Sequence, residues 1–366
     1  MLFPQLGQNP LDIQDLSLGK PAFFPIIVCM NPHRIRSFVP FSEQKVVQFC
    51  NTGAVVRRAQ GVPVKIISIG EVLWDVVGGA EHLGGAPFNF AAHVAALGHN
   101  VLFISAVGAD ERGQQVLERM SEMSLSSRYV RHLKRYPTGV ATVTLDGQGQ
   151  PQFVIHRPAA YDFPELTDPE WKELVSCSPE WVYFGTLLQM SPQARQLTSK
   201  ILDVAPQARR FYDVNLRVNC YQASLVRDLM SQASVVKLNE HEVAEIARLL
   251  GGEASSLEEF CRSYSQRFGW EAVCVTCGAD GCELLIGDEY VTAKGYPVEV
   301  VDTVGAGDAF AAAFVHGFAA GWPASEIADF ANRVGAIVAS RPGAIPKWSL
   351  EEVRCLQRQI QVREQK

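Results

Sequence analysis

The segment at residues 302–310 combines residue types that suit the chemistry of phosphate groups. It reads DTVGAGDAF and is followed by an alanine-rich stretch. Two glycines around one alanine let backbone N–H groups converge at a helix N-terminus, where those groups and the helix dipole stabilise an anion. Asp308 comes next and could accept a proton from a hydroxyl that attacks the bound anion. The pattern therefore predicts Asp308 as a general base beside an anion hole formed by Gly305, Ala306 and Gly307.

Taken alone, the segment 302–310 has a simpler explanation. Gly-Ala-Gly can form a tight turn, and an aspartate can cap a helix without any catalytic role. The segment also lacks the spacing of a P-loop and of a dinucleotide-binding fingerprint. Other parts of the chain must therefore decide between the two interpretations.

A second group of glycine and polar residues lies far upstream. Residues 84–91 read GGAPFNFA, and residues 70–75 read GEVLWD at the end of a short β-branched run. With the segment 302–308, they resemble the ribokinase/PfkB family of carbohydrate kinases, whose signatures are G-G-x-x-x-N and, later in the chain, D-T-x-G-A-G-D. Both signatures occur in the expected order, and the resemblance covers residues 64–348. It implies a kinase that moves the γ-phosphate of ATP onto a sugar hydroxyl.

The resemblance assigns sugar binding to the first signature. Asp75 and Asn89 would hydrogen-bond the sugar hydroxyls, and the backbone of Gly84 and Gly85 would let the sugar approach closely. A carboxylate and an amide place acceptors and donors in fixed directions, as discrimination between hydroxyl configurations requires. The simpler alternatives are a strand-end turn at Asp75 and a helix-start residue at Asn89.

Two further segments resemble family motifs that handle phosphate. Residues 213–217 read DVNLR and match D-x-N-x-R, in which Arg217 could reach the substrate or the transferring phosphate. Residues 239–242 read NEHE and match N-x-x-E, which implies that Asn239 and Glu242 help to organise phosphate and Mg²⁺, the metal through water. Lys237 could neutralise the triphosphate or could be an ordinary solvated lysine.

The nucleotide and cation sites are implied by the resemblance alone. Residues 276–281 read TCGADG, like the T-x-G-x-x-G loop of the family, which assigns ATP contacts to Thr276, Gly278 and Gly281. Asn332 occupies a position from which relatives touch the adenine. Relatives also bind a monovalent cation, potassium, and the matching residues are Asp302, Val304, Arg341 and Gly343.

The identity of the sugar depends on a few positions. Ribokinases carry a glutamate after the strand that corresponds to residues 181–184, whereas this chain reads GTLLQMSP there, which argues against ribose. The spelling GGAPFN and the segment 156–162, HRPAAYD, resemble bacterial fructokinases and favour fructose as the substrate, with fructose 6-phosphate as product. Arg157 is counted among the substrate-binding residues. A contact from Arg157 to a carboxylate would instead favour a sugar acid such as 2-keto-3-deoxygluconate.

Other functions stay open at this point. A nucleoside kinase, a catalytically silent sugar sensor and a Rossmann-type dehydrogenase are alternatives. The intact Asp308 argues against the sensor. The absence of G-x-G-x-x-G after the first β-branched run argues against the dehydrogenase.

The elements that must position these residues can be read from alternating patterns. Strand-like and helix-like runs alternate, which predicts a mostly parallel sheet covered on both faces, and the resemblance implies a ribokinase-like three-layer α/β/α sandwich. The expected strands are 64–70, 101–107, 181–184, 210–214, 234–237, 272–276 and 297–301. The expected helices are 90–97, 113–123, 192–204, 240–250 and closely packed helices within 310–340. Extended segments at 71–85 and 137–158, with a hairpin signal at 146–149, predict a small β-sheet lid.

Composition sets the remaining expectations. The chain has 366 residues and a net charge of −6, without a long Lys/Arg run, so nucleic acid is not an expected partner. No apolar run reaches the ~18 residues that span a bilayer, so we expect no membrane segment and a cytoplasmic protein. Residues 1–62 are expected to form a disordered or loosely docked extension, 63–350 the kinase domain and 351–366 a tail. In many relatives the lid also forms a homodimer interface, so the resemblance implies a homodimer here.

Overall fold

The computed structural model describes residues 63–145 and 151–356, with side chains omitted at 143–145 and 151–153. Every described residue belongs to one compact unit. The expectations for 1–62, for the hairpin signal at 146–149 and for 357–366 lie outside the described residues.

Nine strands of the described chain form one large sheet in the order β13-β12-β11-β10-β9-β8-β1-β4-β5. The pairs from β11 to β5 are parallel, and β12 and β13 add an antiparallel edge. The expected mostly parallel sheet is therefore confirmed. Its strands are β1 (Lys65–Ile69), β4 (Asn100–Gly108), β5 (Val130–Leu133), β8 (Trp181–Gly185), β9 (Arg209–Asp213), β10 (Val235–Asn239), β11 (Ala272–Thr276), β12 (Gly281–Ile286) and β13 (Glu289–Lys294).

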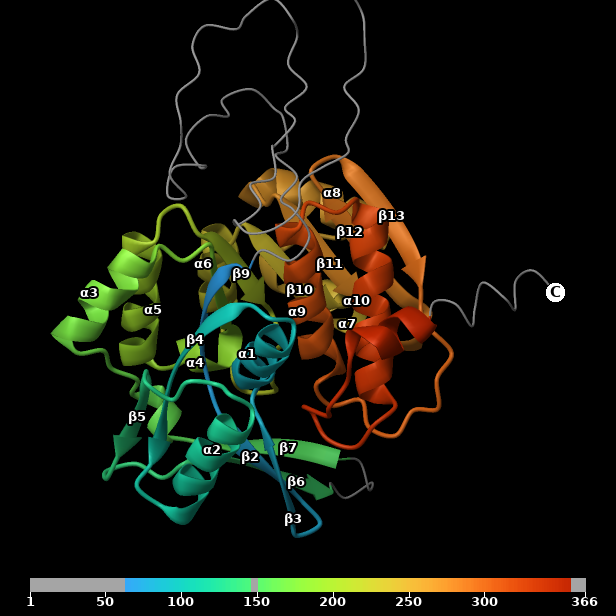
Figure 1. Cartoon of the computed structure of the whole chain (residues 1–366). Helices are drawn as coiled ribbons and strands as arrows, with labels where there is room; N and C mark the ends of the chain where they lie inside the picture. Colours follow the sequence, from blue (N-terminus) through green and yellow to red (C-terminus); the bar gives the residue numbers. More distant parts are fainter. Residues whose placement is uncertain (1–62, 146–150, 357–366) are drawn as a thin grey trace, which may run out of the picture. The chain divides into compact units, whose positions relative to one another are not determined.

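Helices cover both faces of this sheet. Successive residues of a strand point to opposite faces, so neighbouring residues of one strand pack against different helices. Phe211 of β9 packs in the core with α1, α9 and α10, whereas its neighbour Tyr212 packs in the core with α5, α6, α7 and α8 (Figure 1). The helices are α1 (Ala86–Ala96), α2 (Glu111–Glu122), α3 (Asp168–Cys177), α4 (Thr186–Gln189), α5 (Pro192–Val204), α6 (Ala223–Gln232), α7 (Glu240–Leu250), α8 (Leu257–Phe268), α9 (Ala306–Ala319) and α10 (Ala324–Ala339), with short 3-10 helices η1 (Ala160–Asp162) and η2 (Gly278–Asp280).

A second, smaller sheet of four described strands lies beside the large one (Figure 1). It has the order β3-β2-β6-β7 and comes from the two extended segments that predicted it. Its strands are β2 (Leu73–Val77), β3 (Ala80–Gly84), β6 (Gly139–Leu145) and β7 (Pro151–His156).

One expected strand is wrong. Residues 297–301 form neither strand nor helix, and Val300 and Val301 are each 58% exposed. Pro297 cannot donate a ladder hydrogen bond, and the N–H of Val301 donates to Ala339 O at the end of α10 instead of to a strand. Before this segment, β12 and β13 form an antiparallel hairpin at the edge of the sheet, and the sequence reading did not identify either strand.

Candidate active site

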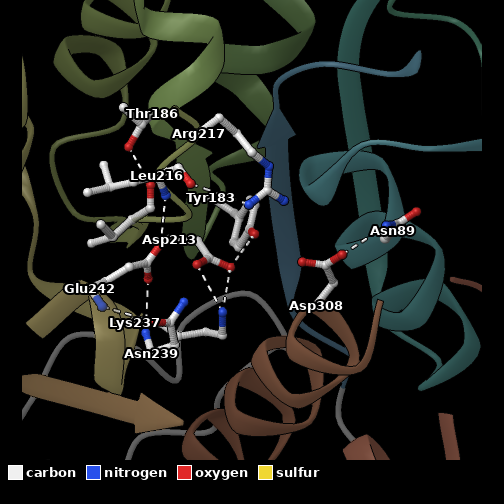
Figure 2. Close-up of polar contacts among 11 residues, drawn as sticks. Asn89, Tyr183, Thr186, Asp213, Leu216, Arg217, Lys237, Asn239, Glu242 and Asp308 are labelled. Atoms are coloured by element: carbon white, nitrogen blue, oxygen red, sulfur yellow. Dashed lines mark hydrogen bonds and ion pairs between the residues drawn. The ribbon is translucent and has the colours of Figure 1, made fainter. Parts of the chain in front are cut away.

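Three polar side chains lie together at the carboxyl ends of neighbouring strands. Asp213 ends β9 and is paired in register with Lys237 of β10. Lys237 Nζ lies 3.0 and 3.1 Å from the two carboxylate oxygens of Asp213, and the hydroxyl of Tyr183 donates to Asp213 Oδ2 at 2.8 Å. All three are buried, so the site begins with a desolvated ion pair at the edge where parallel sheets bind ligands (Figure 2).

The sheet register decides which helices this cluster meets. Tyr183 shares a face of β8 with Trp181, and Lys237 shares a face of β10 with Val235, because residues two apart point to the same side. Trp181, Tyr183 and Val235 all belong to the core that packs with α1 and α9. Tyr183 also stacks on Phe90 of α1, with ring centroids 3.8 Å apart. The ion pair is therefore directed toward the helices that carry both family-like signatures.

Asp308 lies in the first turn of α9, where the sequence predicted it. It is 8% exposed, and Asn89 of α1 donates from Nδ2 to its Oδ2 at 2.8 Å (Figure 2). The two residues are 219 positions apart in the chain. The structure thus brings the two signatures into direct contact.

The surroundings of Asp308 shift its acidity. Burial, with the charge of Asp213 added, raises the pKa of Asp308 to about 6, although Lys237, the Asn89 hydrogen bond and Arg217 act in the opposite direction. A carboxyl with such a pKa is ionised near neutral pH and takes up a proton more readily than an exposed aspartate. These properties suit a general base.

The backbone around Asp308 forms the expected turn into a helix. Gly305 is the N-cap of α9 with φ 80°, and no side chain of the described residues caps the first turn. A Cβ atom on Gly305 would lie 2.3 Å from Ala344 O, so only glycine fits. A Cβ atom on Gly307 would lie 3.4 Å from Lys237 Nζ, which places that ammonium beside the same helix end. A cation and backbone N–H groups thus converge where an anion would bind.

We expect Gly305→Ala to disrupt this turn strongly. The variant combines a left-handed backbone, which costs a non-glycine residue about 1–2 kcal/mol, with a clash against the backbone of Ala344. Gly98→Ala is the matched control, because Gly98 also has a positive φ of 84° but has free space around its Cβ position. Denaturant unfolding and kcat should show a loss in both for Gly305→Ala, and a loss of stability alone for Gly98→Ala. If the two variants lost the same stability and Gly305→Ala kept its activity, the predicted clash with the backbone of Ala344 would be contradicted.

The predicted sugar-binding residues lie on the small sheet and on α1. Asp75 of β2 is half-buried, and its Oδ2 would lie 2.8 Å from a Cβ atom on Gly84, so the two residues are in close contact. Gly85 precedes α1 with φ 112°, where a Cβ atom would lie 2.5 Å from Glu71 O. Burial raises the pKa of Asp75 and of Asp308, and the charge of Arg217, which is exposed in the loop after β9, acts in the opposite direction on both. Figure 2 shows its guanidinium directed toward the space beside Asp308.

The sequence reading missed Glu71, although it lies in the quoted segment 70–75. Its side chain is buried, and Glu71 Oε2 has no hydrogen-bond partner among the described residues. Burial raises its pKa to about 7, against the effect of its own backbone N–H and of Arg217. Asn89 Oδ1 is also buried, and no group in the described part of the chain bonds to it. Both oxygens could therefore accept a hydrogen bond from a bound hydroxyl group or from water.

Arg157 does not reach into this site as a free cation. Its guanidinium pairs with Asp162 through Nε and Nη2, and its Nη1 donates to Leu187 O at 2.9 Å. Because Asp162 is 3% exposed, the pair is largely desolvated. The structure therefore ties Arg157 to the loop before α3 and to α4.

The residues assigned to phosphate and Mg²⁺ form the start of α7. Asn239 Oδ1 accepts from the N–H of Glu242 at 3.0 Å, and Glu242 Oε2 accepts from the N–H of Asn239 at 2.9 Å, which is a capping box. Glu242 Oε1 accepts from the N–H of Leu216 at 2.6 Å (Figure 2). Both carboxylate oxygens are therefore engaged with backbone and hold the loop that carries Arg217.

The residues assigned to the nucleotide surround the edge hairpin. Gly281 begins β12, where a Cβ atom would lie 2.0 Å from Ala293 O, so closure of the hairpin itself requires this glycine. Asn332 Nδ2 donates to Ala293 O and Lys294 O at 3.1 and 3.2 Å. The remaining two, Thr276 and Gly278, lie at the end of β11 and in the exposed turn after it.

The four residues assigned to a monovalent cation lie in the two loops that flank α9 and α10. The carboxylate of Asp302 accepts from the N–H groups of Val304 and Gly343, each at 3.0 Å, and so joins the loops. The Arg341 guanidinium donates to Lys347 O and pairs with Glu352. Within the described residues, no group of three or more His, Cys, Asp or Glu side chains is arranged to hold a metal ion. A cation here would depend mainly on backbone carbonyl groups.

Comparison with known proteins gives consistent matches over most of the chain. The family described as pfkB family carbohydrate kinase matches residues 49–350. A putative sugar kinase of Pyrococcus horikoshii is 29% identical over 304 residues, which are 78% of this chain and 92% of the relative. A fructokinase of Escherichia coli is 28% identical over 277 residues, covering 72% of this chain and 87% of the relative.

Solved structures agree with the fold. The Pyrococcus protein in complex with ATP has a TM-score of 0.67 at 27% identity and covers 80% of this chain and 99% of its own. A fructokinase of Xylella fastidiosa with bound ATP has a TM-score of 0.72 at 24% identity, over 81% of this chain and 99% of its own. Among the helices that the structure describes, none is long and apolar enough to cross a bilayer.

Proposed function

The chain belongs to the pfkB family of carbohydrate kinases, which are phosphotransferases with an alcohol group as acceptor, and from that premise we propose that it converts fructose to fructose 6-phosphate with ATP as donor. The observation that carries the proposal is the hydrogen bond between Asn89 and Asp308, which joins the segment that we assign to the sugar to the helix end that we assign to the phosphate. The fructokinase relatives favour fructose among the sugars.

The proposed reaction uses groups that the site already holds in place. The sugar hydroxyl attacks the γ-phosphorus of ATP, its proton passes to a carboxylate oxygen of Asp308, and the bond from the γ-phosphorus to ADP breaks. The N–H groups of 305–307 and the ammonium of Lys237 would stabilise the charge on the transferred group. The small sheet, carrying Asp75, would close over the sugar and keep water out.

The environment of Arg157 favours a neutral sugar over a sugar acid. A guanidinium that binds a substrate carboxylate needs free donors and a charge that is not already balanced. Asp162 balances the charge of Arg157, and Leu187 O takes a further donor. We therefore prefer fructose to 2-keto-3-deoxygluconate as the substrate, and we prefer either of these to a nucleoside substrate or to a catalytically silent sensor.

The residues present fit Mg²⁺ only through water. Both oxygens of Glu242 accept backbone N–H groups, so a metal bound with the nucleotide would contact this carboxylate through its water shell, as Mg²⁺ often does. When bound, Mg²⁺ would supply charge neutralisation at the phosphates. Potassium, if bound near Asp302, would face a carboxylate that already accepts two N–H groups.

The test is ADP release by the purified protein with ATP, Mg²⁺ and K⁺ against fructose, ribose, 2-keto-3-deoxygluconate and adenosine. Fructose-dependent release is the expected result. Activity with another of these acceptors would keep the kinase mechanism and replace the proposed substrate. Sugar binding without any ADP release would overturn the proposal in favour of a sensor.

The pH dependence of the reaction should report the acidity of Asp308. The raised pKa of about 6 is that of Asp308 in the enzyme without substrate, which kcat/KM reports. Because the base must be unprotonated to accept a proton, kcat/KM should fall as pH drops below about 6 and level off above pH 7. The slope below the pKa should approach tenfold per pH unit. A profile that is flat from pH 7 to pH 5 would contradict the role of Asp308 as the base.

A further inference from the structure

His93 is a buried titratable residue that the proposed mechanism does not use. It lies on α1, is 1% exposed and follows Asn89 by four residues, so both side chains lie on one face of the helix. Its two ring nitrogens have different partners. Nδ1 lies 3.2 Å from Trp348 Nε1, and Nε2 lies 3.0 Å from Ala344 O.

The chemistry of the partners fixes the tautomer of His93. An indole N–H can only donate, so Nδ1 must accept and cannot carry a proton. A carbonyl oxygen can only accept, so Nε2 must carry the proton and donate to Ala344 O. An imidazolium would direct an Nδ1 proton against the indole N–H. Burial agrees with a neutral ring, since it lowers the pKa of His93 to about 4, more than the Ala344 hydrogen bond raises it.

The carbonyl that His93 holds is in contact with the candidate anion hole. Ala344 is 4% exposed, and its O and Cα atoms lie 2.3 and 2.6 Å from the Cβ position of Gly305. The adjacent residue Gly343 donates its N–H to Asp302 Oδ2 at 3.0 Å. Two hydrogen bonds, one from α1 and one to Asp302, therefore fix the loop that packs directly on the N-cap of α9.

We propose that His93 is a positioning residue for phosphoryl transfer, which holds the loop at Ala344 against Gly305 and so sets the geometry of the anion hole relative to the sugar. Helix α1 then carries three functions on one element. Gly85 at its start approaches the sugar, Asn89 holds the base, and His93 holds the backbone beside the phosphate. This inference rests on the proposed function, because it assigns the anion hole its role in the reaction.

The kinetic test uses replacements that separate shape from hydrogen bonding. His93→Leu fills the space but leaves Ala344 O and the Trp348 N–H unpaired, so kcat should fall about 10²-fold, the effect of a misplacement near 1 Å, with little change in the KM for the sugar. His93→Gln can again place an amide N–H near Ala344 O and should recover most of kcat. His99→Leu is the matched control, since His99 is a half-buried histidine whose Nε2 bonds to His316 and not to this loop.

Thermal unfolding of each variant separates catalysis from stability. The proposal is supported if kcat is low in His93→Leu, recovers in His93→Gln and is normal in His99→Leu, while the three variants have similar melting temperatures. A wild-type kcat in His93→Leu would overturn it. A kcat that falls equally in His93→Leu and His99→Leu, in proportion to lost stability, would also overturn it.

A second measurement tests the geometry without any activity. Nitrogen-15 NMR of the full chain, assigned with His93→Gln, should show His93 with a protonated Nε2 and a bare Nδ1 from pH 8 to about pH 5. A protonated Nδ1 within that range would overturn the tautomer and with it the proposal. If the wild-type protein phosphorylates no sugar, the proposed function fails by itself, and the NMR result still decides whether His93 holds the loop.

Discussion

Replacing Asp308 by asparagine is expected to lower kcat by about 10²–10⁴-fold, the usual contribution of a general base. Asparagine keeps the size of the side chain and can still bond to Asn89, but it cannot accept the proton of the sugar hydroxyl. The residue is buried in the first turn of α9, so water is poorly placed to substitute for it. Initial rates with saturating ATP and sugar measure the effect. Calorimetric titration should show that binding of both substrates is retained.

Asn89→Ala is the companion variant, because it removes the hydrogen bond to Asp308 and a candidate sugar ligand together. It should raise the KM for the sugar and lower kcat, whereas Asp308→Asn should change kcat alone. If Asp308→Asn kept kcat within about tenfold, the base would have to be another carboxyl. Glu71 would be the first to examine, since it is buried, has an unpaired oxygen and has a pKa of about 7.

Local signals explain why some elements could be predicted with their bounds. Ser191 caps α5 by accepting from the N–H of Ala194, and proline follows at the first helical position. Asn239 opens α7 with a capping box, and Gly251 ends it in the left-handed conformation. Such contacts lie within a few residues and leave a pattern in the sequence. Both helices have the expected ranges.

The wrong strand at 297–301 and the missed edge hairpin have a different cause. Valines at 298, 300 and 301 suggest a strand locally, but a strand also needs a partner along its edge. Here the backbone turns toward the end of α10, and β12 and β13 occupy the edge of the sheet. The hairpin itself did leave a local signal, since only Gly287 and Asp288 separate Ile286 of β12 from Glu289 of β13, and the sequence reading overlooked it.

The candidate site shows the same division. Glycines and polar residues of the two signatures stood out, and the structure brings Asn89, Asp308 and Lys237 together. Tyr183 and Glu71 did not stand out, because each lies in or beside an apolar strand where a buried residue has an ordinary explanation. Glu242 was singled out as a metal residue, but its visible role is to fix two backbone segments. A motif identified these residues but not what each of them contacts.

Replacing Lys237 by methionine should destabilise the fold by about 3–5 kcal/mol, the typical effect of breaking a buried ion pair. Asp213 is fully buried, and without the ammonium its remaining side-chain partner among the described residues would be the hydroxyl of Tyr183. The nearby carboxylate of Asp308 would add repulsion, since burial and the charge of Asp213 already raise the pKa of Asp308. Denaturant unfolding gives the change in the free energy of unfolding.

Asp213→Asn should destabilise the fold less than Lys237→Met does. Burial lowers the pKa of Lys237, but the charges of Asp213, Asp308 and Glu242 outweigh this effect and raise it. In Asp213→Asn, the carboxylates of Asp308 and Glu242 would still stabilise the ammonium. The double variant Asp213→Asn, Lys237→Met removes both charges and should recover much of the stability lost by Lys237→Met. It should not recover activity, since Lys237 Nζ lies beside Gly307 at the proposed anion hole. A double variant that is stable and inactive would separate the two roles of this lysine. Recovery of kcat together with stability would show that Lys237 acts on the fold alone.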